Sequence, residues 1–151
     1  MKLWNKLISS VLLAGALTSC SGYFINPYNP DWYKIDDSKI PKEVDTPKEI
    51  LLWMYQNIDY KIHGHRCFLP QETLNNGYGD CDDQAVLELA IYSKRCNKKG
   101  SLLTGYNPMD GVGHAEANYC GETFYQPYLF TIEKEYPFDD IQYFENFYVL
   151  D

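Results

Sequence analysis

Apolar residues recur at helical spacing immediately after a helix-start signal at Thr46. Thr46 can cap a helix, Pro47 suits its first position, and Glu49 can complete a capping box. The apolar positions that follow lie close to one face of a helix. They are Ile50, Leu51, Met54 and Ile58, with Trp53 beside them. The pattern predicts a helix that ends near Asp59 and places Trp53 in the core.

A second helical pattern begins at Cys81. Its apolar positions form one wide stripe, made by Ala85, Val86, Leu89, Ala90 and Tyr92. A stripe of this width is typical of a largely buried helix. Gly77 and Gly79 come just before it and let the backbone turn sharply into the helix. The Lys-Lys-Gly sequence at 98–100 is expected to end it, and a short helical turn is predicted upstream at 71–74.

Alternating apolar and polar residues, typical of strands, follow this second helix. We expect strands at 101–106, 113–119 and 123–130, with a tight turn around Gly121 that joins the last two as a hairpin. Residues 143–150 could add a final strand. The expected fold class is α+β, in which the second helix packs on a small antiparallel sheet.

The first residues of the chain resemble a targeting signal. Two lysines precede a short apolar run, and Leu17-Thr18-Ser19-Cys20 resembles the lipobox of bacterial lipoproteins. The resemblance implies that residues 1–19 are a signal peptide and that Cys20 carries lipid such as palmitate. An ordinary secretory peptide is the alternative. Both place the mature protein outside the cytoplasm, and the lipid would anchor it to a bacterial membrane.

Residues 20–45 are predicted to form a tether, and residues 46–151 a single domain. The tether contains repeated X-Pro steps and no sustained periodicity, a pattern that favours extended or turn backbone. Tyr28, Trp32 and Tyr33 could instead pack back on the core.

The charge of the chain argues against nucleic acid as a partner. The formal net charge is −8, and the basic residues are dispersed, whereas binding to phosphates needs a positive stripe. No cofactor is expected. Without a CxxC pair or a complementary ligand cluster, no metal site is expected either. His63 and His65 flank a glycine and are expected to face solvent in a turn.

Cys81 and His114 together suggest nucleophilic chemistry. A cysteine at a helix N-terminus meets unpaired backbone N–H groups and the positive end of the dipole, which favour the thiolate form. His114 follows on a predicted strand and could serve as the base. The structural alternative is that Cys81 lies in a disulfide. Once Cys20 is set aside, four cysteines remain for up to two bridges, namely Cys67, Cys81, Cys96 and Cys120.

Four segments resemble the transglutaminase-like cysteine peptidase superfamily. They are Leu69-Pro70-Gln71-Glu72-Thr73-Leu74, residues 77–85, Gly113-His114-Ala115-Glu116 and Phe124-Tyr125-Gln126-Pro127. The match runs from about Thr46 to Pro127 and implies a papain-like fold with Cys81 and His114 as catalytic residues. Gln126 stands where the family has an aspartate. An amide can orient the histidine but cannot stabilise its cationic form as a carboxylate does.

The resemblance implies a thiol hydrolase or acyltransferase that cleaves amide bonds through a thioester on Cys81. Its substrate would be a peptide, a protein or a peptidoglycan stem peptide. Two other classes stay open. One is an inactive binding module, whose many tyrosines would supply a contact surface, and the other is a structural lipoprotein stapled by disulfides. Asp80, Asp82 and Asp83 are expected to start the helix, with calcium binding, as in some bacterial members of the family, as the alternative.

Overall fold

The first expected helix begins at its capping box. In the computed structural model, which describes residues 32–63, 67–119 and 131–143, helix α2 runs over Pro47–Asn57. Glu49 N donates to Thr46 Oγ1 at 3.3 Å, and Thr46 N donates to Glu49 Oε2 at 3.2 Å. Trp53 is buried with its neighbours on the same face. The predicted start and core face of this helix are therefore confirmed.

Two short strands and a short helix lead into the central helix. Strand β1 (Asp59–Tyr60) pairs in parallel with β2 (Tyr78–Gly79), and helix α3 (Pro70–Asn76) lies between them in the chain. Helix α3 ends at Gly77, whose φ of 70° lies in the left-handed region that favours glycine. The helical turn predicted at 71–74 is confirmed as part of α3.

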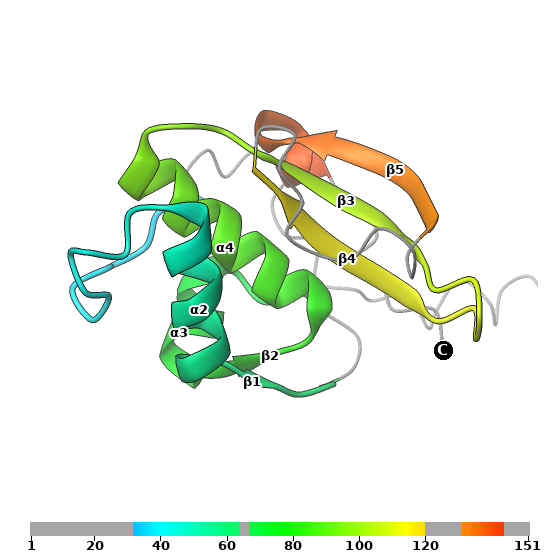
Figure 1. Ribbon diagram of the computed structural model, residues 1–151, viewed down its shortest axis with the longest axis horizontal. Helices are drawn as coiled ribbons and strands as arrows, with labels where there is room; N and C mark the ends of the chain where they lie inside the picture. The colour runs from blue at the N-terminus through cyan, green and yellow to red at the C-terminus, as the bar shows by residue number, and fades with distance from the viewer. Residues whose placement is uncertain (1–31, 64–66, 120–130, 144–151) are drawn as a thin grey trace, which may run out of the picture.

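Helix α4 (Cys81–Cys96) is the centre of the molecule. Figure 1 shows it between helices α2 and α3 on one side and the sheet on the other. All five positions of the predicted apolar stripe are buried, and they are Ala85, Val86, Leu89, Ala90 and Tyr92. The helix ends at Asn97, which adopts the left-handed conformation at φ 51°, three residues before the glycine expected to stop it.

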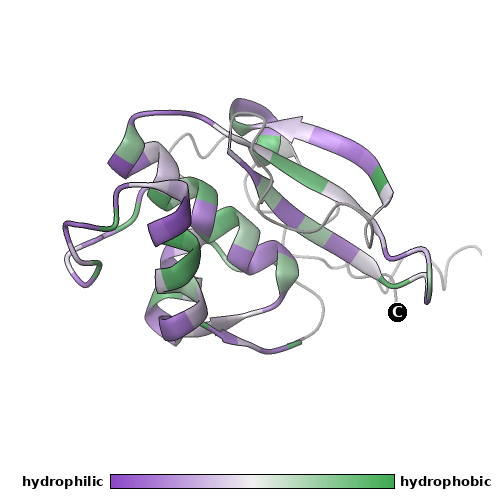
Figure 2. Ribbon diagram, viewed as in Figure 1, coloured by the Kyte–Doolittle hydropathy of each residue, from purple (hydrophilic) through white to green (hydrophobic). Residues whose placement is uncertain are grey.

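Among the described residues, the larger sheet has three strands in the order β4-β3-β5, all antiparallel. Strands β3 (Ser101–Tyr106) and β4 (Gly113–Asn118) fall where the alternation predicts them. Strand β5 (Thr131–Pro137) was not expected, and a 3-10 helix, Phe138–Tyr143, follows it. Figure 2 shows why the sequence pattern did not predict β5: β3 is hydrophobic in its middle, whereas β5, at the edge of the described sheet, is mostly hydrophilic.

The segment before α2 belongs to the core, so the predicted tether is wrong from Trp32 onward, and the alternative that Trp32 and Tyr33 pack on the core is confirmed. Trp32, Ile35, Ile40 and Val44 are all buried in the main hydrophobic cluster. Polar contacts with the end of α4 hold the segment there: Lys94 Nζ donates to Ile35 O at 2.7 Å, and Arg95 Nη2 donates to Ile40 O at 2.9 Å. Asp37 forms ion pairs with both Lys94 and Arg95 at 2.7 Å. The pattern of apolar residues in the sequence does not predict these contacts.

The remaining predictions about elements fall on other parts of the chain. The strand expected at 123–130 lies outside the described residues, as does 144–150 of the last expected strand. The observed architecture is a mixture of helices and antiparallel sheet, as the expected α+β class requires. No helix among the described residues is both long enough and apolar enough to cross a membrane.

Candidate active site

Cys81 is the first residue of α4 and is half-buried. Its position depends on a close approach between β2 and the first helical turn. A Cβ added at Gly79 would lie 2.6 Å from Asp83 Cβ, so only glycine lets the two backbones come this near. The thiol is thus held at a helix N-terminus, where backbone N–H groups are unpaired and the dipole favours negative charge.

His114 reaches Cys81 from β4, which packs against α4. A hydrogen bond with the Cys81 side chain and a second one with Glu116 raise the pKa of His114 to about 9, although burial opposes the charged form. His114 Nε2 lies 3.3 Å from Glu116 Oε1. The imidazole therefore contacts the side chains of Cys81 and Glu116, and both contacts favour its charged form.

An open pocket of about 60 Å³ lies against these groups. Its lining comes from β1, α4 and β4, and it consists of Tyr60, Cys81, Gln84, Ala85, Glu88, His114, Ala115, Glu116 and Ala117. Neither lysine nor arginine is among the described residues that line it. Because the pocket is open, a small molecule or a side chain of a larger molecule could enter it beside the Cys81 thiol.

Glu88 forms the buried acidic part of this pocket. It is 8% exposed, and Tyr119 Oη donates to its Oε2 at 2.7 Å. Burial raises the pKa of Glu88 to about 7, with a smaller contribution from the charge of Glu116, while the hydrogen bond from Tyr119 lowers it. Burial therefore favours the neutral form of this carboxyl group below about pH 7.

The structure brings Cys81 and His114 together but leaves the third expected residue untested. Gln126 lies outside the described residues, as do Cys20 and Cys120. Glu116 is the described carboxylate in contact with His114, and it was not proposed from the sequence as a site residue. The available signal was its spacing from His114, because residues two apart in a strand point to the same face.

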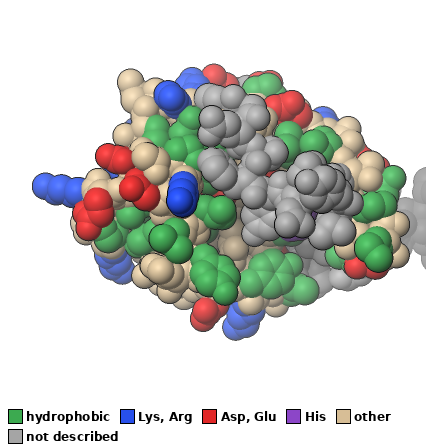
Figure 3. Space-filling view, in the orientation of Figure 1, with side chains coloured by type: hydrophobic (Ala, Val, Ile, Leu, Met, Phe, Trp, Pro, Cys, Tyr) green, Lys and Arg blue, Asp and Glu red, His purple; other side chains and the backbone are tan. Residues whose placement is uncertain are grey.

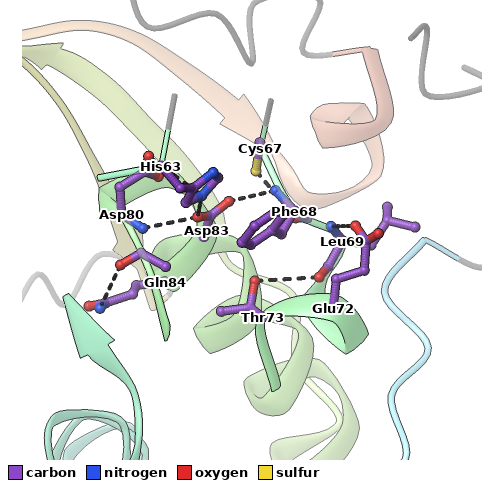
Figure 4. A network of polar contacts seen from close by, with 10 residues as sticks. His63, Cys67, Phe68, Leu69, Glu72, Thr73, Asp80, Asp83 and Gln84 are labelled. Carbon is purple, nitrogen blue, oxygen red and sulfur yellow. Dashed lines mark hydrogen bonds and ion pairs between the residues drawn. The ribbon is translucent and has the colours of Figure 1, made fainter. Parts of the chain in front are cut away.

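A second polar cluster lies beside the start of α4, and it corrects the expectation that His63 faces solvent. His63 Nε2 contacts Asp83 Oδ2 at 2.5 Å, and its ring stacks on Phe68 with centroids 3.9 Å apart. Figure 4 shows Asp83 at the centre, where it also accepts from Phe68 N at 2.5 Å and from Asp80 N at 2.9 Å. Asp83 thus ties α4 to the loop before α3. His65 lies outside the described residues.

The acidic residues around Cys81, namely Asp80, Asp82 and Asp83, are buried. Burial, reinforced by a hydrogen bond to Asp80 and by neighbouring charge, raises the pKa of Asp82 to about 8. Burial also raises the pKa of Asp83 against the effect of His63 and the backbone donors. Asp83 supports the helix-start interpretation through its bond with Asp80 N.

Among the described residues, two sets of side chains have the composition and spacing to hold a metal ion. They are His63 with Asp80 and Asp83, and Cys67 with Asp82 and Asp83, and within each set the ligand atoms lie within 4.8 Å of one another. Asp80 Oδ1 and Asp82 Oδ1 are buried without a hydrogen-bond partner among the described residues. The first set has no local sequence pattern, because more than one element of the fold separates His63 from the acidic residues.

The three described cysteines, Cys67, Cys81 and Cys96, are all free thiols. Cys81 is therefore not bridged to either of the other two. Cys67 is fully buried, and burial raises the pKa of its thiol well above the ordinary range. Of the described thiols, Cys81 is the one that lines the pocket.

No family model matches the chain, and comparisons with curated proteins and with solved structures find no match either.

Proposed function

We propose that the protein is a thiol hydrolase or acyltransferase that cleaves amide bonds, with Cys81 as nucleophile and His114 as general base and acid. The observation that carries the proposal is the placement of Cys81, His114 and Glu116 at one small pocket, with His114 bonded to both of the others. A nucleophile, a base and a residue that orients the base define this type of catalysis more specifically than any one of them.

The geometry supports a defined sequence of steps. The Cys81 thiolate attacks the carbonyl carbon of the substrate, while His114 holds the proton from the thiol. His114 then gives this proton to the leaving amine, the C–N bond breaks, and a thioester remains on Cys81. A water molecule next attacks the thioester while His114 accepts a proton from that water. The acid leaves, and the proton returns to the thiol.

Glu116 supports the charged form of His114 during this cycle. A carboxylate both orients the ring and stabilises the imidazolium. This role was expected of residue 126, where glutamine could provide orientation alone. Glu116 thus supplies the negative charge that the resemblance to transglutaminase-like peptidases left missing. The backbone N–H groups at the start of α4 would stabilise the developing oxyanion.

The proposed setting is extracytoplasmic, with the protein anchored to a bacterial membrane by lipid at Cys20. This part rests on the charged start, the apolar run and the lipobox-like Leu17-Thr18-Ser19-Cys20. Peptides, surface proteins and peptidoglycan stem peptides are the amide substrates available there. On the face shown in Figure 3, acidic and basic side chains are interspersed, an arrangement that offers no positive stripe for nucleic acid.

The test is the rate of iodoacetamide labelling at Cys81 across pH, followed by peptide mapping. At pH 6 an ordinary thiol with a pKa of about 8.5 is almost entirely protonated and reacts slowly. We expect Cys81 to react rapidly at this pH and to slow at least tenfold in His114→Ala. Cys96, half-buried and bonded to Asp45 O, is an internal reference thiol that should react slowly in both proteins.

Slow labelling of Cys81, or labelling that ignores His114, would contradict the enzyme proposal and favour the inactive binding module. If Cys81 instead labels rapidly, brief incubation with an activated ester tests whether the reactive thiol forms an acyl-enzyme, which would appear as a mass increase on Cys81. An enzyme should show the acyl adduct in the wild type and lose it in Cys81→Ala.

A further inference from the structure

The acidic residues in the pocket exceed what the catalytic cycle uses. Glu116 pairs with His114, but Glu88 makes no contact with the thiol or the imidazole in any hydrogen bond or ion pair among the described residues. Glu88 nevertheless lines the same pocket and is more than nine-tenths buried. With no cationic partner for Glu88 among the described residues, burial favours its neutral form, and a cationic ligand that entered the pocket would favour its charged form.

The charges around the pocket are unbalanced. When catalysis begins, the thiolate of Cys81 and the imidazolium of His114 offset one another, and Glu116 and Glu88 remain as two acidic groups. Among the described residues that line the pocket, no lysine or arginine neutralises them. A ligand with one positive charge would reduce this imbalance, whereas a carboxylate ligand would increase it.

The shape of the pocket limits the size of that ligand. Its volume of about 60 Å³ corresponds to roughly four to six water positions, at 10–15 Å³ for each. Three of its lining residues are alanines, Ala85, Ala115 and Ala117, whose small side chains leave room for a narrow apolar stem. A short alkyl chain that ends in an amine has a matching number of heavy atoms.

The distance along α4 fits the same ligand. Glu88 is seven residues after Cys81, which is about 10 Å along the helix axis at 1.5 Å per residue. The glutamate side chain leans back toward the helix N-terminus and shortens this gap. The remaining distance suits a side chain of lysine length on the residue whose carbonyl carbon is attacked.

We propose that the pocket selects acyl donors that carry a primary ammonium group on a short alkyl side chain, with Glu88 as the residue that binds the ammonium. This inference rests on the proposed function, because the ammonium must enter next to a reactive Cys81. Gln84 and Tyr60 also line the pocket. Tyr119 holds the Glu88 carboxylate in place through its hydroxyl group.

The test compares two alkylating probes that differ in one charge. N-acetyl-lysine chloromethyl ketone carries the ammonium, and N-acetyl-norleucine chloromethyl ketone has a similar chain without it. In both reactions the Cys81 thiolate displaces chloride and forms a thioether. At limiting probe concentration we expect the lysine probe to label Cys81 at least tenfold faster in the wild type.

Variants then assign the preference to Glu88. In Glu88→Gln, which keeps the shape and an oxygen that can accept from Tyr119, the lysine-to-norleucine ratio should fall close to one. Glu133→Gln makes the same chemical change at an exposed position on β5 and should keep the wild-type ratio. The thermal unfolding midpoint of each variant checks that it folds. If Glu88→Gln does not fold, the comparison of the two probes in the wild type still tests the ammonium preference.

The outcomes separate this inference from the proposed function. If Cys81 reacts rapidly with iodoacetamide but equally with both ketones, the thiol is activated and the ammonium preference is overturned. A ratio that persists in Glu88→Gln also overturns the role of Glu88. If Cys81 resists iodoacetamide and both ketones, the proposed function fails and the inference fails with it.

Discussion

Replacing Glu116 with glutamine should lower the pKa of His114 with little change in shape. Glutamine is nearly isosteric with glutamate and can still accept a hydrogen bond from His114 Nε2, but it lacks the negative charge. Cys81 contributes most to the raised pKa of His114, and Glu116 is the second cause. The variant therefore removes the smaller of the two favourable contributions and leaves the larger one in place.

The size of the effect follows from the pKa and the exposure of the ring. A pKa of about 9 against an ordinary 6.5 corresponds to roughly 3 kcal/mol, at about 1.4 kcal/mol for each pKa unit. The imidazole is 36% exposed, so solvent screening reduces this to about 1–2 kcal/mol. If Glu116 supplies less than half, its loss should lower the pKa of His114 by about half a unit.

The measurement is a nuclear magnetic resonance titration of the ring nitrogens of His114 in the wild type and in Glu116→Gln. Because the pKa of His114 is raised, the stability it adds is fully present below about pH 6.5 and is lost as the pH rises through about 9. In Glu116→Gln, where the pKa of His114 is lower, this stability should be lost at a lower pH than in the wild type. Glu133→Gln serves as the control, and an unchanged or higher pKa of His114 in Glu116→Gln would refute the reasoning.

Three further perturbations test other parts of the structure. The raised pKa values of Glu88 and Asp82, about 7 and about 8, mean that the folded protein holds protons that the unfolded chain releases, so this component of stability should fall as the pH rises from about 4 to 8. Between pH 5 and pH 8, the free energy of urea unfolding should fall less in Asp82→Asn than in the wild type. An equal fall would contradict the raised pKa of Asp82. Gly79→Ala should cost about 1–3 kcal/mol by urea unfolding and slow the labelling of Cys81, because the new Cβ would meet Asp83 Cβ at 2.6 Å; unchanged values would show that the backbone yields easily. Ile40→Ala should cost about 2–5 kcal/mol, since Ile40 is 3% exposed, whereas a residue in a free tether would cost almost nothing by the same assay.

The sequence revealed those elements whose signals are local. The capping box at Thr46 and the stripe on α4 depend on residues within one or two turns, so they could be predicted without knowledge of the fold. Strand β5 could not. Thr131-Ile132-Glu133-Lys134-Glu135 is dominated by polar residues, and it is a strand because β3 offers it an edge to pair with.

The candidate site divides along the same line. Cys81 and His114 were found from residue type and from the elements expected around them. Glu88 was not, because an acidic residue in the middle of a helix resembles a solvent-facing position until the sheet is seen to cover it. The contact between His63 and Asp83 spans 20 residues, and the packing of Trp32 depends on Phe138, with ring centroids 5.2 Å apart. Such pairings depend on tertiary structure that no local pattern encodes.

The contact between Asp37 and the end of α4 sets the orientation of the pocket relative to the preceding chain. Lys94, which pairs with Asp37, is 13 residues after Cys81 on α4. At 1.5 Å per residue, these two positions lie roughly 20 Å apart along the helix axis. If the protein is anchored by lipid at Cys20 as proposed, α4 would be a rigid spacer between the packed segment that begins at Trp32 and the Cys81 thiol. The length of that helix would then set which bonds of a large polymer come within range of the thiol.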